Sequence, residues 1–103
     1  MANAYAVNIY PKPTPGQTDE RLTVSSTAVP FTTTWKSGNN RFVVLDVQTS
    51  DVMVTFDSST PTSSNGHRLY SGKSYTWDVD TADAASFIRV SADAAIQASG
   101  FTY

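Results

Sequence analysis

Few side chains in this sequence are able to transfer a proton, because it holds one histidine, His67, and one glutamate, Glu20. Acid–base and nucleophilic catalysis need such a group within hydrogen-bond reach of its target, oriented by a further residue. His67 could combine with any of many serines, so that pattern carries no information, and the G-x-S-x-G elbow is absent. A glycosidase pair would have to come from aspartates, several of which sit at predicted turns. We therefore expect a protein that is not an enzyme.

The densest acidic group is Asp78, Asp80 and Asp83, which could hold a cation such as calcium. The sequence lacks the D-x-D-x-D-G pattern and the later glutamate of an EF-hand loop. The other interpretation is a solvated turn in which an aspartate caps a short helical segment at residues 81–85. We expect no metal and no cofactor, and the sequence leaves the cation question open.

Aromatic side chains are numerous for a chain of 103 residues. Exposed rings on a β face can stack on sugars or anchor a protein interface, whereas buried rings belong to a core. Trp35, Tyr70, Tyr75 and Trp77 are the rings that could form such a platform. Alternation puts Tyr75 and Trp77 on one face, as in a half-buried strand, so we expect Trp35 and Trp77 to pack in the core.

Composition limits the fold that must position these residues. Ser and Thr make up about a quarter of the chain, while charged residues make up only 16%, a balance that suits strands and turns. The net charge of -2 and the scattered Lys and Arg argue against nucleic acid as a partner. No cysteine is present. No stretch resembles a leader or a membrane span, so we expect a protein made in the cytoplasm that does not bind a membrane.

Alternating apolar residues predict about eight short strands separated by turn signals, as in an antiparallel β-sandwich or a squat barrel. The apolar run at residues 42–47 predicts a central strand buried on both faces, forming a hairpin with residues 52–56. Strands are also predicted at residues 21–29, 31–35, 67–70 and 75–79, and a terminal hairpin at residues 87–90 and 95–101. The chain is expected to be one β domain over residues 1–103, with the sandwich or barrel in residues 20–103.

The N-terminal residues 1–16 predict an extended arm or an edge strand. Residues 11–16, PKPTPG, hold three prolines, which forbid a helix. The residues that we expect to contact a partner lie in this arm and at the opposite end of the chain: Tyr5, Ile9, Tyr10, Pro11, Pro13, Pro15 and Tyr103.

Residues 41–77, RFVVLDVQTSDVMVTFDSSTPTSSNGHRLYSGKSYTW, resemble a pattern in small β-structured virion proteins of tailed bacteriophages. There, a V-x-V-T-F-D strand precedes a D-x-S-x-P-x-x-x-N-G-H loop and an L-x-x-G-x-x-Y-x-W hairpin. The later ADAASFIRVSADAAIQAS fits as a terminal hairpin. The resemblance covers about 60 residues of the C-terminal part.

The resemblance implies a virion structural protein, chiefly a capsid decoration (cement) protein that stabilises the shell. Its partners would be the major capsid protein and neighbouring copies of itself, and it would lie on the capsid surface after synthesis in the host cytoplasm. Two alternatives remain. One is a component of the neck or tail. The other is a carbohydrate-binding β-sandwich of the fibre or adhesin kind, which requires two coplanar exposed rings.

Overall fold

The computed structural model describes residues 14–37, 40–56 and 59–102, and this part of the chain is almost entirely β-structure. Two short helices interrupt the strands: a 3-10 helix at Trp35–Ser37 and α1 at Val79–Ala84. The eight described strands are β1 (Thr14–Val24), β2 (Val29–Pro30), β3 (Phe42–Gln48), β4 (Val52–Thr55), β5 (His67–Leu69), β6 (Ser74–Asp78), β7 (Ser86–Arg89) and β8 (Ala94–Thr102).

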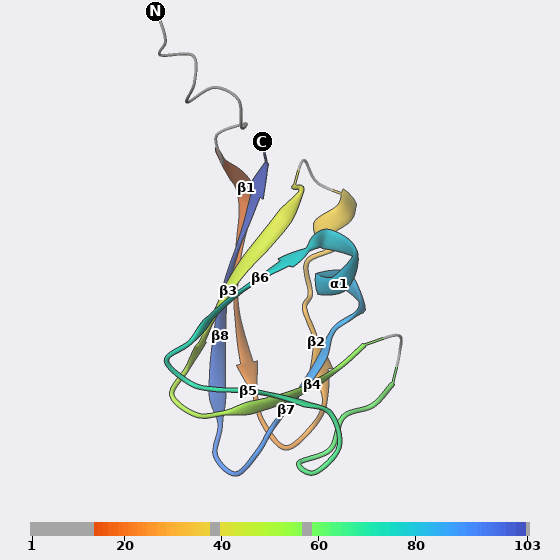
Figure 1. The fold of residues 1–103 in the computed structure, drawn as a ribbon, viewed down its shortest axis with the longest axis vertical. Helices are drawn as coiled ribbons and strands as arrows, with labels where there is room; N and C mark the ends of the chain where they lie inside the picture. The colour runs from red at the N-terminus through yellow and green to blue at the C-terminus, as the bar shows by residue number, and fades with distance from the viewer. Residues whose placement is uncertain (1–13, 38–39, 57–58, 103) are drawn as a thin grey trace, which may run out of the picture.

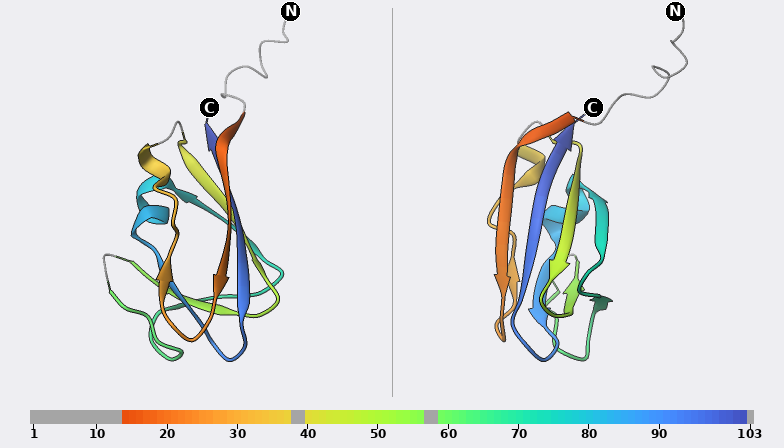
Figure 2. Two further views of the ribbon diagram at one scale, coloured as in Figure 1. Left: turned by 180° about the vertical axis from the view of Figure 1, so that it is seen from behind. Right: turned by 90° about the vertical axis from the view of Figure 1, so that its left-hand side faces the viewer.

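The strands form two four-stranded antiparallel sheets that face one another (Figures 1 and 2). The first sheet has the order β1-β8-β3-β6, and the second has the order β2-β7-β4-β5. Apart from β4 and β5, every two strands that follow each other along the chain belong to different sheets. This interleaved order is that of a jelly roll, a double sheet built from two Greek keys. The expectation of an all-β antiparallel sandwich is confirmed.

Both predicted hairpins are wrong, because the two strands of each belong to different sheets. β3 pairs with β6 and β8, and β4 pairs with β5 and β7, so β3 and β4 never meet in one ladder. The chain leaves the first sheet through Thr49, whose φ is 79°, with the Ser50 amide donating to the Gln48 carbonyl at 2.9 Å. This tight three-residue turn redirects the chain towards the second sheet.

The predicted terminal hairpin fails in the same way. β7 pairs with β2 and β4 in the second sheet, whereas β8 lies between β1 and β3 in the first. Local turn chemistry indicates where a chain bends but not whether the next strand pairs with the last one. Here long-range pairing on both sides of β8 decides the outcome.

The predicted strand at residues 31–35 is also wrong, because two carboxylates take the backbone donors that a ladder would use. Glu20 accepts hydrogen bonds from the amides of Thr32 and Thr33, each at 2.9 Å. Asp83 accepts from the amides of Trp35 at 2.6 Å and Lys36 at 3.0 Å. The segment therefore leaves β2 after Pro30 and ends in the 3-10 helix.

The core lies between the sheets, and β3 shows how it is filled. Val43, Leu45 and Val47 are buried, while the residues between them are half-buried on the outer face. β3 is therefore central in its sheet, as expected, but only one of its faces is in the core. Side chains from both sheets and from the segment after β2 complete the core: Leu22, Val24, Phe31, Trp35, Val52, Val54, Leu69, Phe87, Ile96 and Ala98.

Glu20 supports a prediction about pH. Partial burial raises the pKa of Glu20, but the hydrogen bonds from Thr32 and Thr33 outweigh this effect, so its pKa is lowered. A carboxyl with a lowered pKa in the folded state stabilises the fold above its unfolded pKa, and this stabilisation is lost as pH falls through the folded pKa. We expect Glu20→Gln to be less stable than wild type at pH 7 and to lose less stability between about pH 5 and pH 3. Urea unfolding at a series of pH values measures both effects.

The control for this experiment is Asp19→Asn, which removes a charge from the exposed residue beside Glu20. Its stability at pH 7 should stay close to that of wild type, because surface substitutions away from specific contacts have small effects. Parallel stability–pH curves for wild type and Glu20→Gln would contradict the role given to the Glu20 carboxylate.

Candidate functional site

Tyr70 is the one large hydrophobic side chain classed as exposed among the described residues, with 53% of its surface accessible. It directly follows β5, an edge strand of the second sheet. Along β5 the side chains alternate, so Leu69 enters the core while Arg68 and Tyr70 project to the outside. A strand end thus presents an aromatic and a basic side chain side by side.

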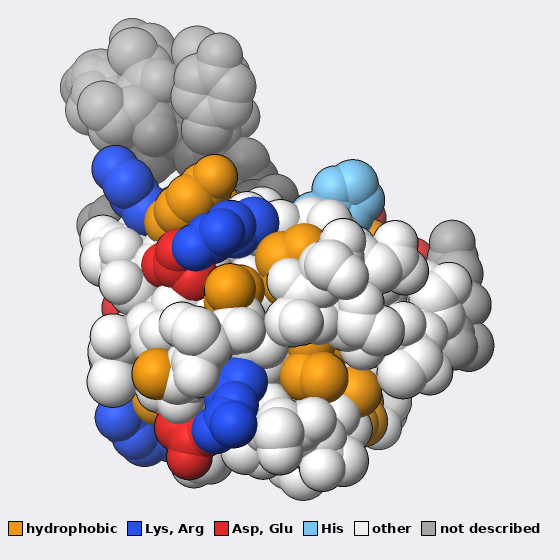
Figure 3. Space-filling view, turned by 90° about the horizontal axis from the view of Figure 1, so that it is seen from below, with side chains coloured by type: hydrophobic (Ala, Val, Ile, Leu, Met, Phe, Trp, Pro, Cys, Tyr) orange, Lys and Arg blue, Asp and Glu red, His pale blue; other side chains and the backbone are white. Residues whose placement is uncertain are grey.

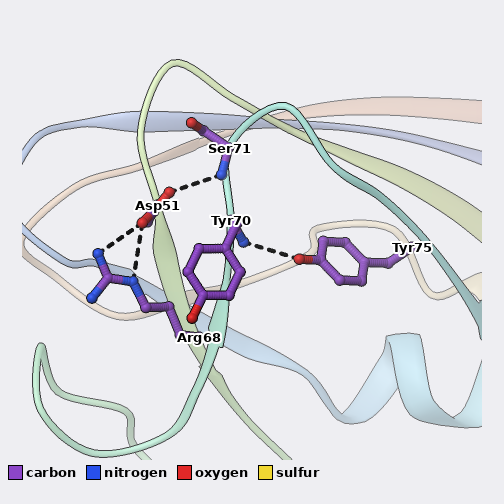
Figure 4. A network of polar contacts seen from close by, with 5 residues as sticks. All are labelled: Asp51, Arg68, Tyr70, Ser71 and Tyr75. Carbon is purple, nitrogen blue, oxygen red and sulfur yellow. Dashed lines mark hydrogen bonds and ion pairs between the residues drawn. The ribbon is translucent and has the colours of Figure 1, made fainter.

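An ion pair fixes Arg68 in one position. Its Nε and Nη2 atoms donate to Oδ2 of Asp51 at 3.0 and 2.7 Å (Figure 4). Its guanidinium carbon lies 5.6 Å from the centroid of the Tyr70 ring, within the range of a cation–π contact. Exposed ion pairs contribute little to stability, but the geometry of this one places the guanidinium against the ring.

Backbone hydrogen bonds fix the turn that carries Tyr70. The Tyr70 amide donates to the Tyr75 hydroxyl at 3.0 Å, and the Ser71 amide donates to Oδ1 of Asp51 at 2.8 Å (Figure 4). The hydrogen bond from Ser71 is the main reason that the pKa of Asp51 is lowered, followed by the one from Arg68. The Asp51 carboxylate therefore stays ionised and joins the start of β4 to the β5–β6 turn.

Asp51, Arg68, Tyr70, Ser71 and Tyr75 together form what we call the Tyr70 site. Tyrosine and arginine are enriched among the residues that contribute most to protein interfaces. Asp51 holds the Arg68 side chain, and Tyr75 and Asp51 hold the backbone at Tyr70 and Ser71, before any partner arrives. This lowers the entropy lost on binding. The site is equipped to contact another surface through an aromatic ring and a cation.

The surface seen in Figure 3 is mainly uncharged and polar. On that face apolar side chains form small separate areas, and basic side chains lie beside acidic ones. Binding through such a surface would depend on a few well-held residues rather than on a continuous apolar patch.

Most of the predicted contact residues lie outside the described part of the chain: Tyr5, Ile9, Tyr10, Pro11, Pro13 and Tyr103. Pro15 is described at the level of the backbone, where it belongs to β1 and pairs with Phe101 of β8. From Thr14 onwards, the edge-strand alternative for residues 1–16 is therefore the one observed.

Three of the four rings proposed as a sugar platform pack in or against the core. Trp35 is fully buried, with Phe31 in a T-shaped contact at 5.5 Å. Trp77 stacks on Phe87 at 6.1 Å, and Tyr75 is partly buried against the core. Among the described residues, Tyr70 alone is left as an exposed ring, so the two coplanar exposed rings required by the carbohydrate interpretation are not found.

The three aspartates of the acidic cluster have separate partners. Asp78 caps α1 by accepting from the Thr81 amide at 2.7 Å. Hydrogen bonds from the Thr81 side chain and from its amide lower the pKa of Asp78. Asp80 forms an exposed ion pair with Lys36 at 3.2 Å, and Asp83 binds backbone amides of the 3-10 helix. Within the described ranges, no group of three or more His, Cys, Asp or Glu residues could hold a metal ion. The predicted aspartate cap is confirmed.

The sequence identified Tyr70 as a candidate binding ring but did not identify the residues that surround it. The available signal was the Arg-x-Tyr spacing, which puts two side chains on one face of a strand. The missing partner was Asp51, which is distant in sequence and is brought near because β4 pairs with β5.

No described helix is long and apolar enough to cross a membrane. Searches against family models, curated proteins and solved structures gave no match for this chain.

Proposed function

We propose that this chain is a non-enzymatic structural protein of a tailed bacteriophage particle, most specifically a decoration protein that binds the outside of the capsid shell through the Tyr70 site. The observation that carries the proposal is the exposed Tyr70 ring, held beside an Arg68 guanidinium that is itself fixed by Asp51. A protein that binds a partner needs exposed side chains held in position. The packing of the domain itself does not require an exposed Tyr70 ring.

Two further points support the phage assignment. The sequence over residues 41–77 resembles small virion proteins of tailed phages. The jelly-roll strand order also recurs in viral capsid domains, as it does in lectins. The partner would be the major capsid protein, with the capsid surface as the location.

Mass action explains how such a protein would stabilise a shell. A protein that binds the assembled shell but not its dissociated subunits shifts the equilibrium towards assembly. Many identical sites on one shell would add avidity if neighbouring copies also touch each other. Even modest affinity at each Tyr70 site would then protect the particle.

Tyr70→Ala tests the proposal directly. We expect the substitution to weaken binding to mature capsids by about 30-fold, since loss of an interface hot spot costs about 2 kcal/mol. Co-sedimentation would use capsids of the encoding phage purified without this protein. Tyr70→Phe keeps the ring and should bind nearly as well as wild type.

Arg89→Ala is the matched control, because Arg89 forms a comparable exposed ion pair with Asp93 outside the Tyr70 site. It should bind as wild type does. Failure of the wild-type protein to bind capsids would overturn the decoration role, while equal binding by Tyr70→Ala would remove the Tyr70 site from it. In purified particles, copies spread over the whole head are expected, and a single ring of copies would instead indicate a neck or tail component.

A further inference from the structure

β6 is an edge strand with an open side. It pairs with β3 on one side, and no described strand pairs with its other side. In the right-hand view of Figure 2, it forms the border of the first sheet, away from β1. Edge strands present unpaired backbone donors and acceptors, which can pair with another chain.

The register shows which groups of β6 point outwards. Val47 exchanges backbone hydrogen bonds with Gly72 and Lys73, at 2.8 and 3.1 Å. In an antiparallel strand, every second residue directs both of its backbone groups to the same side. The backbone groups of Leu45 and Val43 are therefore also directed towards β6. Their partners Tyr75 and Trp77 therefore bond to β3. This leaves the amides and carbonyls of Ser74 and Thr76 at the open edge, together with the amide of Asp78, whose carbonyl accepts the first hydrogen bond of α1.

The other described edges are less suited to pairing. β2 and β5 have two and three residues, which is too short for a stable ladder. β1 carries an exposed charged residue, Asp19, and charged residues on an edge strand protect it from self-pairing. β6 offers five residues without proline.

We propose that β6 pairs with β6 of a second copy of this chain, around a twofold axis at Thr76, so that the two first sheets join into one continuous sheet. The sequence Ser74–Asp78 suits this register. Thr76 would face Thr76, Tyr75 would face Trp77 of the second copy, and Ser74 would face its Asp78. Threonine pairs and aromatic pairs across antiparallel strands are favourable.

Charge complementarity supports the same register. Lys73 of one copy would lie just beyond the ladder, beside Asp78 at the start of α1 in the other copy. The Lys73 side chain is exposed and makes no ion pair with other described residues. A twofold axis repeats this contact, so each copy supplies one lysine and receives the other. About four backbone hydrogen bonds would form between the strands.

The dimer should be weak, because strand pairing alone buries less surface than a standard interface. We expect a dissociation constant of about 10 µM or weaker. Sedimentation equilibrium of the purified full chain over a concentration series measures it without any capsid. The result is therefore independent of the proposed capsid binding.

A charge exchange at the axis tests the register. The Thr76 side chain is exposed on the outer face, so substitution should leave the domain folded. Thr76→Lys and Thr76→Glu would each place like charges directly opposite one another, and each should weaken the homodimer by about tenfold. An equal mixture of the two variants should form a heterodimer at least as tight as the wild-type dimer.

Thr23→Lys is the matched control, because Thr23 is exposed on β1 at the far edge of the same sheet. It should dimerise as wild type does. Thr76→Pro removes the amide at the axis while leaving the β3 ladder intact, and it should abolish the dimer. A monomeric wild-type protein at about 1 mM, or a mixture that forms no heterodimer, would overturn the proposal.

Discussion

Replacement of Trp35 by alanine is expected to reduce the free energy of unfolding by about 3–5 kcal/mol, the largest loss that we predict for a single side chain. Trp35 is fully buried, and its ring contacts Phe31 edge-on at 5.5 Å. Its removal would leave a cavity at the end of the aromatic cluster that continues through Phe87 to Trp77. Urea unfolding followed by circular dichroism measures the loss, with folding of the variant checked in the same spectra.

Trp35→Phe separates the contribution of ring packing to stability from that of the indole nitrogen. Within the described part of the chain, the buried Nε1 atom of Trp35 has no hydrogen-bond partner. Phenylalanine would keep an aromatic ring in the core and remove this unsatisfied donor, so we expect a loss of about 1–2 kcal/mol. Equal losses for Trp35→Ala and Trp35→Phe would contradict the account in which packing of the ring dominates.

Gly66→Ala is expected to be the second most damaging substitution, with a loss of about 3 kcal/mol. Gly66 has a φ of 139°, a conformation that L side chains rarely adopt. A Cβ atom there would also lie 2.9 Å from the Val54 carbonyl oxygen, which is fixed in the β4 backbone. The strained backbone conformation and the close contact with Val54 would therefore both destabilise the alanine variant. The melting temperature should fall by about 10–20 °C in calorimetry.

Gly72→Ala is the matched comparison for Gly66→Ala. Gly72 also has a positive φ, 82°, but a Cβ atom there would meet nothing within 4 Å. Its expected loss is about 1 kcal/mol, due to conformation alone. If the two alanine variants melted at the same temperature, the contact with Val54 would have no role.

The sequence predicted the class of the fold and several of its elements, because these depend on local pattern. Alternation identified the inward residues Leu22 and Val24 on β1 and the central position of β3, and aspartate chemistry identified the cap of α1. These features arise from side chains within a few residues of one another, where the period of two and helix capping act.

What the sequence could not predict depends on contacts between distant residues. The 3-10 helix at Trp35 exists because Asp83 captures its amides, and the Tyr70 site is complete because Asp51 reaches Arg68. In neither case does the spacing along the chain reveal the partner. The hairpin error at β3 and β4 has the same origin, since a short polar link suits a reversal and a crossing equally well.

The position of β8 has a consequence for synthesis. β8 lies between β1 and β3, so the first sheet lacks a central strand until residues 94–102 have been synthesised. A ribosome releases the chain from its N-terminal end at about 5–20 residues per second. Until then β1 has no partner strand and β3 has only β6, and long-range pairing of this kind is slow. The first sheet is expected to form only after β8 has left the ribosome.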